Sequence, residues 1–188
     1  QISKLIFEPL VDLSSDYKAE PCLAVEWAKQ SDNSYLIKLR ENVRWSDGQS
    51  FTAEDVQFTI DRLKDSQTIY SSNVQDVTGV DIVDDYTVKI NLDREVPFFE
   101  YNLIFPILCQ KNYEGQEFTT SAVNTAPLGT GKYKIVQNTE STITLEKNEN
   151  YKKEESIIEK ITIREFICVG GSLNLPVYNQ IYHALQKN

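Results

Sequence analysis

Alternating apolar and polar residues in several short stretches of the chain predict β-strands joined as hairpins. Within residues 35–40, Tyr35, Ile37 and Leu39 occupy every second position and would share one face of a strand. The same alternation recurs on both sides of a polar Asp-Asp turn in residues 80–92, and on both sides of residues 138–141. Both stretches therefore predict hairpins, and residues 157–166 predict one further strand.

A different spacing, in residues 52–63, predicts one amphipathic helix. Thr52 stands where a helix N-cap is expected, and Asp55 follows at the third helical position, as in a capping box. Glu54 and Asp55 also lie where the positive end of the helix dipole favours carboxylates. The apolar residues at helical spacing form one face: Ala53, Val56, Ile60 and Leu63.

The order of these elements predicts an α+β fold, because strands occur as hairpins and do not alternate with helices. The apolar stretch 98–110 is expected to be a helix or a buried segment. The chain of 188 residues is long enough for one domain with a hydrophobic core or for two small subdomains. Trp27 and Trp45 are expected in that core, as most tryptophans are.

The charge balance narrows the class of partner. The formal net charge is −9, and no basic stripe interrupts the acidic sequence, which argues against nucleic acid and against anionic membrane surfaces. No apolar run approaches the roughly 20 residues that a membrane-spanning helix needs.

The few cysteines and the one histidine offer little for catalysis or for metal binding. Cys22, Cys109 and Cys168 are widely spaced and contain no Cys-x-x-Cys pair, so zinc and redox sites lack the spacing they need. Buried free thiols are expected, and one disulfide with one free thiol is the alternative. His183 has no suitable neighbours for a triad or a metal site. We therefore expect no catalytic residue, no metal and no cofactor.

Two features bear on whether the chain binds a ligand. Glu8 lies between Phe7 and Leu10, so its charge needs either a partner or a cavity. The Gly-Thr-Gly sequence at 129–131 precedes a strand and not a helix, so it does not fit a phosphate-binding loop. Its glycines would provide either a turn with positive φ or a close approach of the backbone to a ligand; the residues alone favour neither.

Several motifs, in order along the chain, resemble one family. Residues 5–27 (LIFEPLVDLSSDYKAEPCLAVEW) are similar to its opening, and residues 35–63 (YLIKLRENVRWSDGQSFTAEDVQFTIDRL) carry its most specific pattern. Residues 126–135 (APLGTGKYKI) and 145–152 (LEKNENYK) resemble two later motifs. The chain thus resembles, over about residues 5–165, the large extracellular solute-binding proteins that deliver oligopeptides, dipeptides or nickel complexes to ABC importers. Pro9 departs from the family's glycine and Lys132 from its proline.

The resemblance implies a periplasmic-binding-protein-like class II fold, of which only the first of two lobes is present. Residues 1–165 would form its N-terminal part, and residues 169–188 its C-terminal return segment. The second lobe would be missing, with the chain rejoined within residues 164–172, near Gly170 and Gly171.

The function that the resemblance implies is capture of peptides or a related small solute outside the cell. The protein would be a monomer, a periplasmic protein or a membrane-anchored lipoprotein, and would present its solute to an ABC permease. One lobe alone should bind its ligand weakly or not at all. A ligand-sensing domain of a regulator or signalling protein with the same fold is the alternative, and an enzyme is not expected. The implied ligand contacts are Glu8, Pro9, Leu10, Gly129, Thr130 and Gly131.

Overall fold

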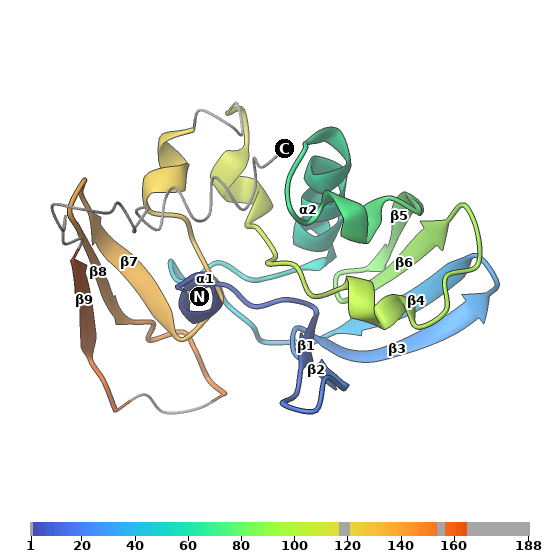
Figure 1. Cartoon of the computed structure of the whole chain (residues 1–188), viewed down its shortest axis with the longest axis horizontal. Coiled ribbons are helices and arrows are strands. Elements are labelled where there is room, and N and C mark those ends of the chain that lie inside the picture. The colour runs from blue at the N-terminus through green and yellow to red at the C-terminus, as the bar shows by residue number, and fades with distance from the viewer. Residues whose placement is uncertain (1, 117–120, 154–156, 165–188) are drawn as a thin grey trace, which may run out of the picture.

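The computed structural model describes residues 2–116, 121–153 and 157–164, which form three antiparallel sheets of two, four and three strands, a short N-terminal helix and one longer helix. Figure 1 shows the four-stranded sheet with α2 at the right, the three-stranded sheet at the left, and α1 (Ser3–Ile6) between them. A two-stranded ribbon of β1 (Val11–Leu13) and β2 (Ala19–Pro21) leads from α1 into the larger sheet. The mixed α+β fold class is confirmed.

The larger sheet has the order β3-β4-β6-β5 and consists of β3 (Ala24–Ser31), β4 (Ser34–Leu39), β5 (Val77–Asp84) and β6 (Thr87–Leu92). Tyr35, Ile37 and Leu39 are buried, so the alternation correctly predicted which face of β4 points into the core. Trp45 is also buried. Trp27 is only partly buried, because it lies on β3, which forms one edge of the sheet.

Helix α2 (Ala53–Asp65) covers the larger sheet and begins where the capping pattern predicted. The Asp55 carboxylate accepts a hydrogen bond of 3.0 Å from the backbone N–H of Thr52. The predicted apolar face is entirely buried. Thr59, outside that apolar pattern, is buried as well: its hydroxyl donates to the Asp55 carbonyl at 2.7 Å and accepts from the Leu108 N–H at 2.9 Å.

The smaller sheet contains β7 (Tyr133–Asn138), β8 (Thr142–Lys147) and β9 (Lys160–Arg164), paired antiparallel in that order. The predicted hairpin and the predicted later strand are both present. Apolar residues on the inner face pack with α1 and the 107–113 segment into a second core cluster. Its buried members are Ile6, Phe7, Leu108, Tyr113, Tyr133, Ile143 and Leu145.

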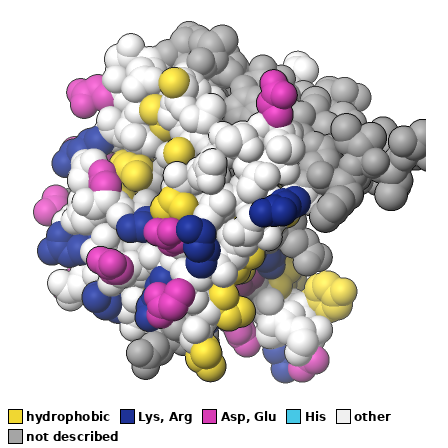
Figure 2. Space-filling model, turned by 90° about the vertical axis from the view of Figure 1, so that its left-hand side faces the viewer, with side chains coloured by type: hydrophobic (Ala, Val, Ile, Leu, Met, Phe, Trp, Pro, Cys, Tyr) yellow, Lys and Arg dark blue, Asp and Glu magenta, His cyan; other side chains and the backbone are white. Residues whose placement is uncertain are grey.

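Figure 2 views the molecule from the side of the smaller sheet, and acidic and basic side chains are intermixed over this face. Two ion pairs start from β8. Glu146 pairs with Lys160 on β9 at 3.2 Å, and Lys147 pairs with Glu159, the residue before β9, at 3.7 Å. The face that Figure 2 shows therefore presents no field of a single sign.

The connections are short 3₁₀ helices and extended segments: η1 (Ser71–Val74), η2 (Phe99–Asn102), η3 (Gln110–Tyr113) and η4 (Ala122–Thr125). The apolar stretch 98–110 contains η2 and the first residue of η3. Between them, residues 103–109 form a largely buried segment without a helix or a named strand, the second of the two expected forms. Among the described residues, no helix has the length and apolar character needed to cross a membrane.

Cys22 and Cys109 are buried free thiols, as expected. The remaining predictions about the C-terminal stretch lie outside the described residues. They concern Cys168, His183, Gly170 and Gly171, the return segment at 169–188 and the expected join.

Candidate functional site

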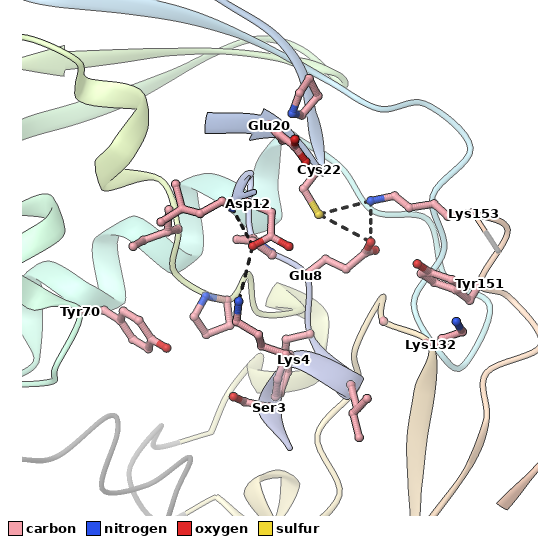
Figure 3. Close-up of a pocket in the computed structure, with 18 residues that line it drawn as sticks. Ser3, Lys4, Glu8, Asp12, Glu20, Cys22, Tyr70, Lys132, Tyr151 and Lys153 are labelled. Atoms are coloured by element: carbon pink, nitrogen blue, oxygen red, sulfur yellow. Dashed lines mark hydrogen bonds and ion pairs between the residues drawn. The ribbon is translucent and has the colours of Figure 1, made fainter. Parts of the chain in front are cut away.

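A cavity of about 470 Å³ opens where the segment after α1, the β1–β2 ribbon and the stretch that follows β8 meet. Glu8, Pro9, Cys22, Gly131 and Lys153 contribute to its wall. Figure 3 shows these elements converging from different parts of the chain, with Glu8 and Lys153 directed towards each other. The cavity therefore combines an apolar wall with a few fixed charges, the usual composition of a small-molecule site.

Glu8 is positioned by the backbone around it. Helix α1 ends at Ile6, and Phe7 on one side of Glu8 is buried, as is Leu10 on the other. The Glu8 carbonyl accepts a hydrogen bond of 3.2 Å from the N–H of Ile107. Anchored in this way, the Glu8 side chain faces the cavity, and only 11% of it is exposed.

The Glu8 carboxylate has a cation and a thiol as partners. The Lys153 ammonium lies 2.6 Å from it and also donates to the Cys22 sulfur at 3.3 Å, while the Cys22 thiol contacts Glu8 at 3.7 Å (Figure 3). Burial alone would lower the pKa of Lys153, but the hydrogen bond and charge of Glu8 outweigh it and raise that pKa above its ordinary value. The expectation that Glu8 needs a partner or a cavity is confirmed, since it has both.

Cys22 is protonated at neutral pH. Burial, followed by the negative charge of Glu8, raises its pKa from 9.0 to about 11. The nucleophilic thiolate is therefore scarce, and Cys22 serves as a weak S–H donor to the carboxylate and not as a reactive group.

The rate of alkylation measures how much of Cys22 is present as thiolate. At pH 8 a thiol with a pKa of about 11 has roughly 100-fold less thiolate than one with a pKa of 9.0. Iodoacetamide should therefore modify Cys22 at least about 100-fold more slowly in the folded chain than in the urea-unfolded chain. The rate in the folded chain should rise with pH up to about 11, and peptide mapping by mass spectrometry would follow it. Equal rates in the folded and unfolded chains would contradict the assignment.

The glycines at 129 and 131 are required by close packing. Neither has a positive φ, so the first of the two alternatives, a turn with positive φ, is wrong. A Cβ atom on Gly129 would lie 1.9 Å from the Ile6 carbonyl oxygen, and one on Gly131 would lie 2.7 Å from the same carbonyl group. The Gly131 N–H donates to the Ile6 oxygen at 2.8 Å. The close approach that glycine permits is thus to the end of α1.

Adding one methyl group at position 129 tests this packing. Gly129→Ala should lower the free energy of unfolding by about 1–3 kcal/mol, because the atom in the way belongs to the backbone and cannot rotate aside. Gly79→Ala is the matched control, since a Cβ there meets no atom within 4 Å. Urea unfolding of both variants gives the comparison, and equal stabilities would refute the packing argument.

The structure brings three of the six sequence-predicted contacts to the cavity wall: Glu8, Pro9 and Gly131. The other three, Leu10, Gly129 and Thr130, are not among its lining residues. Leu10 is fully buried in the main core, and Thr130 is 3% exposed.

The sequence did not reveal the partners of Glu8. Lys153 stands in a charged surface-like stretch, and its contact with Cys22 joins residues 131 positions apart. A second pair at the cavity wall, Lys4 with Asp12 at 3.6 Å, is largely exposed, so its contribution to stability is small.

Comparison with known proteins identifies the class to which this fold and cavity belong. The family described as "Bacterial extracellular solute-binding proteins, family 5 Middle" matches residues 18–167. The chain therefore belongs to the family 5 bacterial extracellular solute-binding proteins.

Individual relatives agree with this assignment. The periplasmic murein peptide-binding protein MppA of Escherichia coli K12 is 26% identical, with 86% of this chain and 34% of that protein covered. The periplasmic oligopeptide-binding protein OppA of Salmonella typhimurium is 30% identical over 56% of this chain and 23% of its own length. The crystal structure of NikZ from Campylobacter jejuni in complex with Ni(L-His) superposes with a TM-score of 0.79 and 28% identity, covering 87% of this chain and 34% of NikZ. The chain spans about a third of the length of such relatives.

Proposed function

We propose that this chain is the first lobe of the substrate-binding component of an ABC importer, which captures a peptide or a related small solute outside the cytoplasm. The observation that carries the proposal is the cavity around Glu8, in a chain that belongs to a solute-binding family. The relatives named above bind murein peptide, oligopeptides or a nickel complex. MppA and OppA are binding proteins by name, and NikZ holds its nickel complex in the crystal, so the regulator alternative gains no support from them.

The wider architecture is part of the same proposal. Residues 1–165 and 169–188 would together form the first lobe, and the second wall of the cleft would come from a second lobe. The complete protein would act as a monomer, periplasmic or anchored as a lipoprotein, and deliver its solute to the permease. Since a single wall buries only part of a solute, the lobe alone should bind weakly.

The proposed ligand contacts have two roles. Glu8, Pro9 and Gly131 line the cavity, where a side chain and backbone edges can meet an extended ligand. Leu10, Gly129 and Thr130 would act behind the wall: Leu10 packs in the core, and Gly129 keeps the 129–131 turn against α1.

Calorimetry with short peptides tests the proposal. The complete two-lobed protein should bind members of a di- to tetrapeptide library, and the 188-residue chain alone should bind the same peptides on the order of 100-fold more weakly. Glu8→Gln should weaken binding by about tenfold, because it removes one charge-assisted contact. Glu20→Gln, which also removes a carboxylate from the cavity wall, is the control that should change affinity less. The absence of heat with every peptide would count against the proposed function and would exclude short peptides as its solute.

A further inference from the structure

We propose that Lys153 is a specificity-determining residue: its ammonium group occupies the position on Glu8 that an ammonium or guanidinium group of the ligand takes when it binds. This inference rests on the proposed function, since it concerns the same cavity. It adds the class of ligand group that the cavity accepts and the residue that competes with that group.

The first argument is the position of the pair. Glu8 and Lys153 both line the cavity, 2.6 Å apart. Figure 3 shows the Lys153 ammonium in contact with both the Cys22 thiol and the Glu8 carboxylate. A ligand group that reaches Glu8 in this cavity therefore meets a carboxylate whose place for a cation is already filled.

The second argument is which partner can move. Glu8 is short, its side chain is 11% exposed, and its backbone carbonyl is held by Ile107. Lys153 has a flexible four-carbon stem, and its side chain is 27% exposed. Exchange is therefore easier by withdrawal of Lys153 than by rearrangement of Glu8, and the withdrawn ammonium can be hydrated.

The third argument concerns the sign of the ligand charge. An anionic group placed at Lys153 would lie close to the Glu8 carboxylate and be repelled by it, because the two charges of the pair are in direct contact. A neutral group would leave Glu8 unpaired if it displaced Lys153, which is unfavourable for a buried carboxylate. A cationic group replaces one ion pair with another and leaves no unpaired carboxylate.

Two substitutions at position 153 should act in opposite directions. Lys153→Met removes the competing charge and keeps the length of the side chain, so affinity for cationic ligands should rise by roughly tenfold. Lys153→Arg supplies a planar fork that can hold the Glu8 carboxylate by two hydrogen bonds, so affinity should fall. Lys152→Met is the matched control: Lys152 is exposed, donates to the Glu149 carbonyl and does not line the cavity.

The test is an NMR titration of the 188-residue chain and its variants with three tripeptide amides. Free Ala-Ala-Ala amide carries an α-ammonium, acetyl-Ala-Lys-Ala amide carries a side-chain ammonium, and acetyl-Ala-Ala-Ala amide carries neither. The affinity gain of Lys153→Met should occur with one or both charged probes and not with the neutral probe. The probe that gains identifies whether the α-amino group or the basic side chain is recognised.

The outcomes are distinguishable. Suppose that the probes bind the wild-type chain. If Lys153→Met then shows no gain in affinity, or gains affinity for the neutral probe as well, the inference is overturned and the proposed function stands. Binding of no probe to any variant overturns the inference, whereas the proposed function is decided by calorimetry on the complete two-lobed protein. Should Lys153→Met fail to fold, the decrease expected for Lys153→Arg decides: unchanged or increased affinity for the charged probes overturns the inference.

Discussion

Asp55→Ala should lower the free energy of unfolding by about 3–5 kcal/mol, measured by equilibrium urea unfolding. The Asp55 carboxylate is buried and accepts three N–H groups: Thr52 at 3.0 Å, Gln110 at 2.8 Å and the Trp45 indole at 3.2 Å. The substitution leaves these donors without their acceptor, and a buried donor without a partner costs about 1–3 kcal/mol. The carboxylate thus joins the start of α2 to two distant segments.

Glu54→Ala is the matched control for this prediction. Glu54 is exposed in the same first turn of α2, so both substitutions remove a carboxylate from the positive end of the helix dipole. The difference between the two variants isolates the hydrogen bonds, since the dipole contribution is similar. A loss of stability no larger for Asp55→Ala than for Glu54→Ala would show that these contacts are unimportant.

Ile60→Ala should lower the free energy of unfolding by about 2–5 kcal/mol. Ile60 is fully buried in the main core cluster, on the face of α2 that covers the larger sheet. Removing its side-chain atoms loses buried apolar surface and leaves a cavity that the surrounding strands fill only in part. Asp61→Ala, at the adjacent exposed position, should change stability by less than about 0.5 kcal/mol.

The urea midpoints of Ile60→Ala and Asp61→Ala show which face of α2 packs against the larger sheet. A nearly neutral Ile60→Ala together with a strongly destabilising Asp61→Ala would mean that the helix presents a different face to the sheet. Thr59→Ala does not serve as an exposed control, because Thr59 is buried and bonds to both Asp55 and Leu108.

The local elements of the fold could be predicted from the sequence because their signals are local. Alternation fixed the buried face of β4, and the spacing from Thr52 to Leu63 placed α2. The burial of Thr59 could not be predicted in this way, since it depends on a contact with Leu108 in a distant segment. The partial exposure of Trp27 likewise follows from the edge position of β3, which only the pairing order of the strands reveals.

The candidate site was predictable in part. The sequence singled out Glu8, because a carboxylate between apolar residues needs a partner. It did not single out Lys153, which contacts Glu8 in the fold but lies far from it in the sequence. The glycines were recognised as positions of close approach or unusual φ. They approach the end of α1. The sequence does not show this, because the contact depends on how α1 packs against the 129–131 turn.

Backbone amide NMR of the 188-residue chain, titrated with a pool of short peptides, tests the central claim most directly. That claim is that the Glu8 cavity forms one wall of a solute-binding cleft. The account predicts weak, saturable shifts concentrated at Glu8, Cys22, Gly131 and Lys153, which line the cavity. Gly79, on β5 of the larger sheet and outside the cavity wall, should not shift. Shifts confined to other surfaces, or none at millimolar peptide, would contradict the account.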